Sequence, residues 1–275
     1  MVKNIKKKFK RIVNRTGKKI YISLLLEIYD VLYKFQLVRK IHYYVSGPRT
    51  PRGYIFILGT YNSGSTMLKQ AIGLHPNVQF SQQETYHYTN GYKDLEGKML
   101  TRGSSGFIGF NRYLDRISID KNKYDQDMNR WYRKNDFFLD KSIPLALYGT
   151  DLVSNFPDAK FIVIKRNDKN VIKGVLKRGK AKGFATRYFG GAEFSKEFCT
   201  TQLEIFKSSI GDICKKSEHG CYVVNYEDFL HNPKSEIEKI FKHIGFCEIN
   251  VSYKDGRLEV GGRFMDVLPG YWGKA

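Results

Sequence analysis

The feature that most constrains the fold is an apolar run that leads into a glycine-rich turn and a helical pattern. Tyr54–Leu58 combines β-branched, aromatic and aliphatic residues, as is typical of a buried strand. A turn with two glycines, Gly59 and Gly64, and four small or amide residues follows, and a helical pattern begins at Thr66. A strand, a glycine turn and a helix in this order direct backbone N–H groups and a helix dipole at one point. The segment therefore predicts an anion-binding loop, against the alternative of a turn that only joins strand to helix.

The glycine spacing matches a P-loop with one substitution. Gly59-x4-Gly64 is followed by Ser65 and Thr66, so that Ser65 replaces the lysine that a P-loop has after its second glycine. In nucleoside triphosphatases that lysine reaches the β- and γ-phosphates. A loop without it favours a phosphate or phosphosulfate ligand, and it disfavours a P-loop kinase of small molecules.

The composition favours a folded domain that binds a polyanion. The chain has 275 residues, 41% of them hydrophobic, and its 47 Lys and Arg against 27 Asp and Glu give a net charge of +20. Such a charge fits a phosphorylated nucleotide, an acidic glycan, nucleic acid or an anionic membrane. Because no recognised nucleic-acid-binding module is present, we expect no nucleic-acid partner.

The cysteines and histidines indicate neither a metal site nor a disulfide framework. The four cysteines show no paired C-x-x-C spacing, and the six histidines are scattered without an H-E-x-x-H pair. We therefore expect no bound metal. The absence of a disulfide pattern favours a cytoplasmic setting.

The N-terminal region predicts a basic segment followed by an amphipathic helix. Residues 3–19 contain nine Lys and Arg and no acid, and Ile20–Val38 is largely apolar. Glu27, Asp30 and Lys34 interrupt that run, and each would cost roughly 2.5–3.5 kcal/mol at the centre of a bilayer. Because no A-x-A-like cleavage site follows, we expect no cleavable signal peptide. The helix either docks on the domain, lies on an anionic membrane surface, or forms a poor transmembrane anchor.

A turn-rich linker at residues 46–53 divides the chain. We assign residues 1–50 to the basic segment and helix, and residues 51–275 to one α/β domain. The expected location is cytoplasmic, and peripheral attachment to an anionic membrane through residues 3–38 stays open.

Beyond the linker, short apolar runs alternate with helical patterns. The expected strands are Tyr54–Leu58, Val78–Phe80, Phe137–Leu139, Phe161–Lys165 and Tyr222–Asn225. The expected helices are Thr66–Gly73, Leu145–Ser154, Lys169–Lys177, Ser195–Lys216 and Lys234–Ile244. This alternation predicts a three-layer α/β sandwich with a central parallel β-sheet, of the P-loop nucleotide-binding type. Residues 88–135 are polar with weak periodicity, and we interpret them as loops and short helices over the site.

Ligands of a parallel sheet bind beyond the carboxyl ends of its strands. The residues that follow the expected strands are Gly59–Thr66, Ser81–Thr85, Asp140–Lys141, Arg166–Asn167 and Tyr226–Asp228. They include a carboxylate in Glu84, a cation in Lys141 and a second cation in Arg166. Arg178 follows Arg166 by about three helical turns and so lies near the same helix face. Two arginines suit a phosphate through bidentate pairing, the alternative being surface ion pairs.

Four blocks of sequence resemble the sulfotransferases that use 3′-phosphoadenosine 5′-phosphosulfate (PAPS). The blocks are Tyr54–Val78, which includes the loop, its helix and His75-Pro76, then Leu139–Pro144, Phe156–Asn167 and Val223–Pro233. They occur in the family's order and spacing and cover about residues 54–246. The third and fourth blocks and Glu84-Thr85 are most similar to the tyrosylprotein and glycan branches of the family.

The resemblance implies one transfer of a sulfuryl group from PAPS to a hydroxyl or amine of an acceptor, with 3′-phosphoadenosine 5′-phosphate (PAP) as product and no metal. The nucleotide-binding residues that it implies are Thr60, Tyr61, Asn62, Ser63, Gly64, Ser65, Thr66, Arg166, Gly174, Arg178 and Lys274. Lys274 comes from a C-terminal segment, starting at Gly261-Gly262, that resembles the family's late loop over the nucleotide. Glu84 would be the general base, and Lys141 would stabilise the charge that develops on the transferring group and bridging oxygen.

The chain departs from the family at two positions of the site. Asn62 stands where the family has a cation at the leaving oxygen, and Gly174 stands where it has a serine at the 3′-phosphate. Lys141 alone, Lys69 or Lys173 would then supply the missing charge. We expect a glycan or glycolipid acceptor, a tyrosine peptide being the other candidate. The alternatives are an attenuated or inert module that binds the nucleotide or an acidic glycan and, less favoured, the small-molecule kinase.

Overall fold

The chain folds around one parallel β-sheet. The computed structural model describes residues 32–33, 35–81, 84, 92–93, 118–134, 136–179, 195–246 and 249–267. Five strands pair in the order β2-β5-β1-β6-β7, every pair parallel. They are β1 (Gly53–Leu58), β2 (Val78–Phe80), β5 (Phe137–Asp140), β6 (Lys160–Lys165) and β7 (Cys221–Asn225). The five strands expected from the apolar runs are confirmed, with boundaries within one residue.

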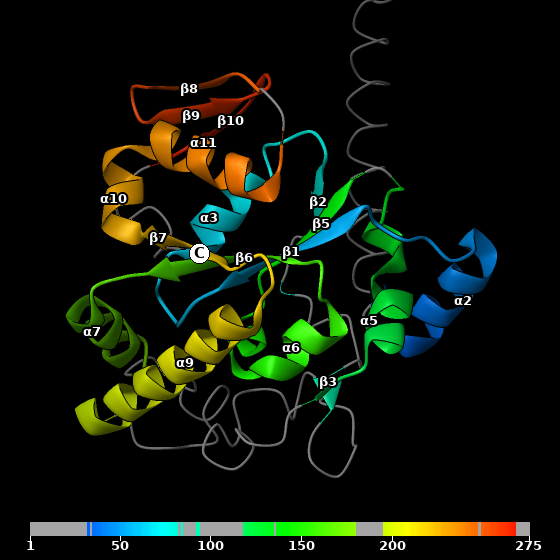
Figure 1. Cartoon of the computed structure of the whole chain (residues 1–275), viewed down its shortest axis with the longest axis horizontal. Coiled ribbons are helices and arrows are strands. Elements are labelled where there is room, and N and C mark those ends of the chain that lie inside the picture. Colours follow the sequence, from blue (N-terminus) through cyan, green and yellow to red (C-terminus); the bar gives the residue numbers. More distant parts are fainter. Residues whose placement is uncertain are drawn as a thin grey trace, which may run out of the picture.

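Helices cover both faces of this sheet, which confirms the three-layer prediction (Figure 1). The helices on one face are α3 (Ser65–Ile72), α10 (Tyr226–His231) and α11 (Pro233–Ile244), and the other face packs against α6 (Thr150–Asn155) and α9 (Lys196–Lys216). Successive side chains of β1 alternate between the two layers, as they must in a strand. Phe56 and Leu58 join the core under α6 and α9, whereas Ile55 and Ile57 join the core under α3 and α11.

Two helical segments differ from the prediction. The expected helix Leu145–Ser154 is a 3-10 helix, η3 (Ile143–Leu147), followed by α6, because Gly149 has a φ of 52° and interrupts the helical backbone. The helix α10 was not predicted, since its six residues follow β7 directly. The next helix after β6 is α7 (Asp168–Gly179), slightly longer than expected.

A second, antiparallel sheet near the C-terminus was also not predicted. It contains β8 (Val251–Lys254), β9 (Arg257–Val260) and β10 (Arg263–Asp266), joined by two tight turns with residues in the left-handed region. Gly261 and Gly262 form the second turn, and Gly261 lies against Ile249 and Pro76. The start of the segment that resembles the late loop is therefore a hairpin turn, and Lys274 lies outside the described residues.

Residues 88–135 contain more regular structure than expected where the structure describes them. β3 (Tyr92–Lys93) pairs with β4 (Ser118–Ile119), and α5 (Lys121–Met128) leads into the 3-10 helix η2 (Asn129–Trp131). Asp120 caps α5 by accepting a hydrogen bond from the backbone N–H of Lys123 at 2.9 Å.

The expected absence of disulfides is wrong. Cys214 and Cys221 form a disulfide with their Cα atoms 5.2 Å apart. The turn between the end of α9 and the start of β7 brings them together, with Gly220 at a φ of 64°. A separation of seven residues is not a recognised pairing motif, so this bond cannot be predicted from the spacing of the cysteines. The pairing removes one reason for expecting a cytoplasmic setting.

The N-terminal helix does not continue unbroken through Val38 as expected. Phe35 has an extended backbone, and a helix, α2 (Gln36–Ser46), begins after it and packs on α5. The rest of the predicted amphipathic helix, up to residue 31, lies outside the described residues. Within the part of the chain that the structure describes, no helix combines the length and hydropathy needed to cross a bilayer.

Candidate active site

The glycine loop (residues 59–64) connects β1 to α3 at the carboxyl edge of the sheet. Its backbone turns sharply, because Asn62 has a φ of 57° and Gly64 a φ of 94°. Asparagine tolerates the left-handed region better than most residues, and glycine occupies it without strain. A Cβ atom at Gly64 would overlap the ring of Tyr226 at the start of α10. Glycine is therefore required at this position by both conformation and space.

Buried polar atoms of this loop have no hydrogen-bond partner among the described residues. They are the side-chain Nδ2 of Asn62 and the Oγ of Ser63, together with Nε of the neighbouring Arg166. Ser63 is only 1% exposed. Buried polar groups almost always have partners, and three such donors at one place suit a ligand with acceptor oxygens. A phosphate or sulfate group has that chemistry.

Arg166 is held against the loop from two sides. It follows β6, and one guanidinium nitrogen donates a hydrogen bond to the backbone oxygen of Asn62 at 2.7 Å. The guanidinium carbon lies 4.2 Å from the centre of the Tyr226 ring, a stacking distance for a cation and an aromatic face. The structure therefore orients Arg166 before any ligand binds.

The carboxamide of Asn62 lies against the helix α7. A Cβ atom at Gly174 would lie 3.0 Å from the Nδ2 of Asn62 and 3.2 Å from its Cγ. The two departures from the family pattern thus contact one another, because the side chain of Asn62 occupies the space next to the glycine. Arg178 lies on α7 as expected, and nothing is described of its side chain.

The remaining predicted residues of the loop and of the start of α3 differ in their burial and in the helices that they contact. Ser65 starts α3 and is buried, and Thr66 next to it is exposed. Tyr61 packs its ring 6.0 Å from that of Phe206 on α9, and Thr60 stands at the loop's entry from β1. Ser63 and Ser65 are therefore buried as whole residues, and the hydroxyl of the half-buried Tyr61 is buried too.

This contact between Asn62 and Gly174 leads to a stability prediction. Alanine stabilises a helix interior by about 1 kcal/mol relative to glycine. We expect Gly174→Ala to give no such gain in the natural protein, since the added methyl group crowds Asn62. In an Asn62→Gly background, which keeps the left-handed backbone, the same change should raise the free energy of unfolding by about 1 kcal/mol. Urea unfolding of the four proteins measures this, and an equal effect in both backgrounds would contradict it.

Glu84 and Lys141 form an ion pair at the ends of two neighbouring strands, β2 and β5. The Nζ of Lys141 lies 2.5 Å from Oε1 of Glu84, whose Oε2 accepts a hydrogen bond from the backbone N–H of Ile143 at 3.2 Å. Lys141 is 6% exposed and Glu84 is 23% exposed. Glu84 is therefore an accessible carboxylate that can accept a proton, and Lys141 is a buried positive charge next to it.

Asp140 fixes the backbone from which Lys141 projects. Its carboxylate is buried and accepts hydrogen bonds from the hydroxyl of Tyr124 at 2.7 Å and from the Oγ of Ser142 at 3.0 Å. These contacts hold the end of β5 against α5. Across the described ranges, no three His, Cys, Asp or Glu side chains gather in a way that could hold a metal ion.

The fold agrees with the comparisons with known proteins. The model of the sulfotransferase family matches residues 54–247, which is more than half of the chain. This chain is a sulfotransferase family member. Sulfotransferase STF1 from Mycobacterium tuberculosis is similar in structure, with a TM-score of 0.51 and 14% identity over 76% of this chain and 73% of that one. Sulfotransferase STF9 from Mycobacterium avium has a TM-score of 0.58 and 10% identity over 76% and 69% of the two chains. No significant match is found among curated protein sequences.

In this sulfotransferase family member, Lys69 is the third cation of the site, after Arg166 and Lys141, and it lies near the Glu84–Lys141 ion pair. It projects from α3, is 5% exposed, and donates a hydrogen bond from Nζ to the backbone oxygen of Ser81 at 3.1 Å. Burial, with the charge of Lys141 as a second cause, lowers the pKa of Lys69 to about 8. From the sequence, Lys69 is expected only as one candidate substitute for the cation that Asn62 replaces. A stronger signal was available, because Met67, Leu68 and other apolar residues surround it in the helix.

The lowered pKa of Lys69 predicts an unusual dependence of stability on pH. Between about pH 8 and 10.5, the unfolded chain holds the Lys69 proton more tightly than the folded chain does, so stability rises with pH. From pH 7 to pH 9.5, the free energy of unfolding should rise by about 2 kcal/mol more in the natural protein than in Lys69→Met. Urea unfolding at the two pH values measures the difference. Parallel changes in the two proteins would show that Lys69 does not titrate in this range.

Proposed function

We propose that this family member transfers a sulfuryl group from PAPS to a hydroxyl or amine of an acceptor. The acceptor that we propose is a glycan or a glycolipid. The observation on which this rests is the meeting of two groups of residues at one sheet edge. The unpaired donors of the glycine loop and Arg166 lie beyond β1 and β6, and the Glu84–Lys141 pair lies beyond β2 and β5. One group suits an anionic donor, and the other suits the removal of a proton beside it.

The residues around the glycine loop fit a nucleotide with two separate anionic groups. The Oγ of Ser63, the hydroxyl of Ser65 and the backbone N–H groups at the start of α3 would hold the 5′-phosphosulfate. Nε of Arg166 and Nδ2 of Asn62 would donate to the 3′-phosphate, where Asn62 replaces the hydroxyl that Gly174 lacks. When bound, PAPS supplies an activated sulfuryl group.

Glu84 and Lys141 would divide the chemistry of transfer. Glu84 accepts the proton that the acceptor hydroxyl loses as its oxygen bonds to sulfur, an effect worth roughly 10²–10⁴ in rate. Lys141 provides positive charge where the transition state gains negative charge on the transferring and leaving oxygens. Lys69, in the second turn of α3, adds to the positive electrostatic potential near Lys141.

The proposed acceptor is anionic or uncharged and carries hydroxyl groups. The net charge of +20 attracts an acidic glycan or the headgroup of a glycolipid. A second candidate, binding of the nucleotide without transfer, is favoured by one observation. The side chain of Asn62 is uncharged and lies against α7, so the glycine loop supplies no cation to the leaving oxygen.

Two measurements on the full chain test the proposal. Isothermal titration calorimetry should show PAP binding at micromolar concentration, and labelled PAPS should transfer its label to at least one member of a panel of glycans, glycolipids and tyrosine peptides. Lys141→Ala serves as the chemically impaired control. Binding of PAP without transfer to any acceptor would support the second candidate, and no binding of PAP would overturn the proposed function.

A further inference from the structure

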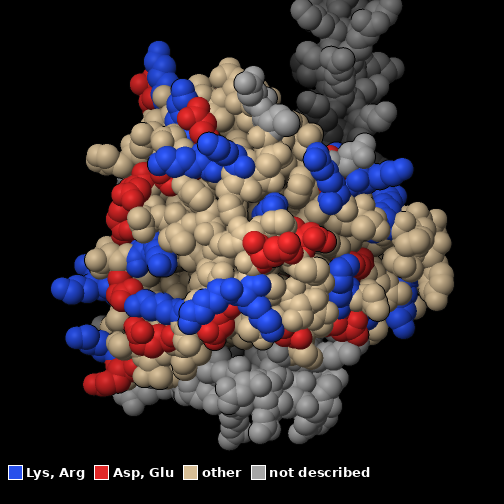
Figure 2. Space-filling model, in the orientation of Figure 1, with Lys and Arg blue, Asp and Glu red and all other residues tan. Residues whose placement is uncertain are grey.

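The helix α2 presents an apolar stripe to solvent. Leu37, Ile41, Tyr44 and Val45 follow the i, i+4, i+7, i+8 spacing of one helix face, and all four are exposed. Tyr44 is 81% exposed and Val45 is 83% exposed. At the right of the molecule, where α2 lies in Figure 1, Figure 2 shows an uncharged surface with Lys and Arg above and below it.

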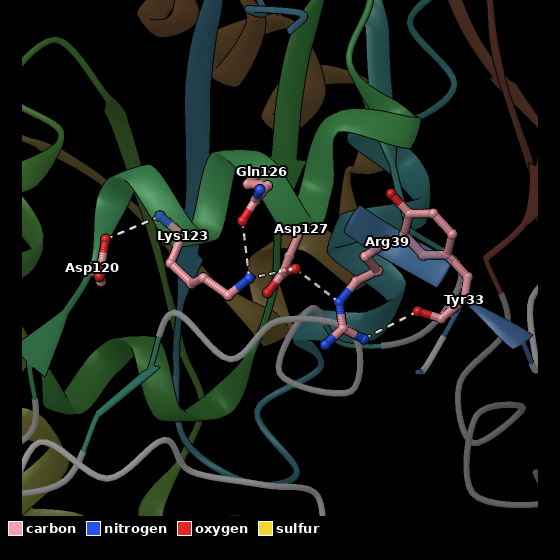
Figure 3. Close-up of polar contacts among 6 residues, drawn as sticks. All are labelled: Tyr33, Arg39, Asp120, Lys123, Gln126 and Asp127. Carbon is pink, nitrogen blue, oxygen red and sulfur yellow. Dashed lines mark hydrogen bonds and ion pairs between the residues drawn. The ribbon is translucent and has the colours of Figure 1, made fainter. Parts of the chain in front are cut away.

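The opposite face of α2 is tied to the domain by buried polar contacts (Figure 3). Nε of Arg39 lies 2.9 Å from the Oδ1 of Asp127 on α5, and another of its nitrogens donates to the backbone oxygen of Tyr33 at 3.1 Å. Lys123 also contacts this carboxylate, at 3.2 Å. Arg39 and Asp127 are almost fully buried, and such a pair is strongly destabilised when one partner is removed.

A second contact fixes the C-terminal end of α2. The side-chain amide of Asn129 donates to the Oγ of Ser46 and to the backbone oxygen of Gly47, both at 3.0 Å. Its Oδ1 accepts a hydrogen bond from the backbone N–H of Arg49 at 2.6 Å. Because α2 is held at both ends, it cannot rotate to bury Tyr44 and Val45 against its own domain.

The surroundings of the stripe are basic. No Asp or Glu occurs between Asp30 and Glu84, and Lys40, Arg49 and Arg52 are exposed within or just after α2. Nine further Lys and Arg lie upstream, at residues 3–19. A protein partner would need an acidic rim to match this pattern. Anionic lipid headgroups match it directly, and aliphatic residues with a tyrosine suit the boundary between headgroups and acyl chains.

We propose that the stripe of Leu37, Ile41, Tyr44 and Val45 docks on an anionic membrane surface, with α2 lying in the plane of that surface. Transfer of each exposed apolar side chain from water into the lipid lowers the free energy, and the negative surface potential of the lipids attracts the basic residues. The domain then has a fixed orientation on the membrane, because the contacts of Arg39 and Asn129 hold α2 against α5 and η2. This inference is independent of the proposed reaction.

Vesicle sedimentation of the full chain tests the proposal. We expect the natural protein to bind vesicles of phosphatidylcholine with about a third of phosphatidylglycerol, and to bind phosphatidylcholine alone far more weakly. The double variant Leu37→Ser with Val45→Ser should bind the anionic vesicles roughly tenfold more weakly. The control is Phe264→Ser, another exposed apolar residue on β10, which should leave vesicle binding unchanged. All substituted positions are exposed, and far-UV circular dichroism checks that each variant folds.

Three results would overturn the proposal. The first is unchanged binding of the double variant to the anionic vesicles, because the basic residues 3–19 alone would then account for vesicle binding. The second is equal binding of the natural protein to charged and uncharged vesicles. The third is a natural protein that is dimeric by light scattering and becomes monomeric in the double variant, since a second copy would then cover the stripe.

Discussion

Lys141→Met is expected to lower the rate of sulfuryl transfer by about 10²–10³-fold and to leave PAP affinity nearly unchanged. The side chain is buried and lies 2.5 Å from Glu84, which fixes the position of its charge. In the proposed reaction, the transition state gains negative charge at this position. Methionine keeps the length and apolar stem of the side chain and removes only the charge. Single-turnover kinetics with an acceptor from the panel, alongside PAP calorimetry, separates chemistry from binding.

The control for this variant is Lys239→Met. Lys239 pairs with Glu236 at 2.7 Å on α11, an ion pair of similar length whose lysine is exposed. Its removal should leave the rate unchanged. A double variant Lys141→Met with Glu84→Gln should be little slower than the slower single variant, because the two residues act on one step. Independent, multiplying effects would show that the pair does not work as a unit.

Arg166→Met is expected to weaken PAP binding by about 10²–10³-fold, more than any other substitution that leaves the fold intact. The guanidinium is oriented by the backbone of Asn62 and by the ring of Tyr226, and its Nε is buried without a partner among the described residues. If Arg166 holds the 3′-phosphate, adenosine 5′-phosphate should bind the natural protein and the variant equally. Calorimetry with both nucleotides tests this.

A matched control for Arg166 lies in the C-terminal sheet. The guanidinium carbon of Arg257 stacks 4.4 Å from the centre of the Phe264 ring, similar to Arg166 on Tyr226, but at an exposed surface. Arg257→Met should leave the affinity for both nucleotides unchanged. Equal losses for PAP and adenosine 5′-phosphate in Arg166→Met would contradict the assignment to the 3′-phosphate and indicate a general distortion of the loop.

The sheet and its loop were predictable because their signals are local. Each strand is a short apolar run, and a parallel sheet brings the ends of such runs to one edge. Position alone therefore selected Glu84 and Lys141, although they are 57 residues apart in the chain. Arg166 was selected in the same way, and the structure places all three along that edge.

The features that the sequence did not reveal depend on distant contacts. Nothing in the spacing of Cys214 and Cys221 indicates that a turn joins them, and the strands β8–β10 are too short for their alternation to stand out. The contact of Asn62 with Gly174 joins the glycine loop to the helix α7, across 112 positions of the chain. Each residue was recognised as unusual by itself, and only the packing of α7 on the glycine loop shows that they belong together.

The position of Glu84, just beyond the edge strand β2, has a consequence for the heat sensitivity of the protein. β2 has three residues, lies at the edge, and pairs only with β5 in the central sheet, whereas β5 is paired on both sides. Short edge strands open locally at a lower free energy than central ones. On warming, the carboxylate of Glu84, the proposed proton acceptor, would therefore separate from Lys141 before the core melts. Activity should then fall at a temperature at which circular dichroism still reports a folded protein.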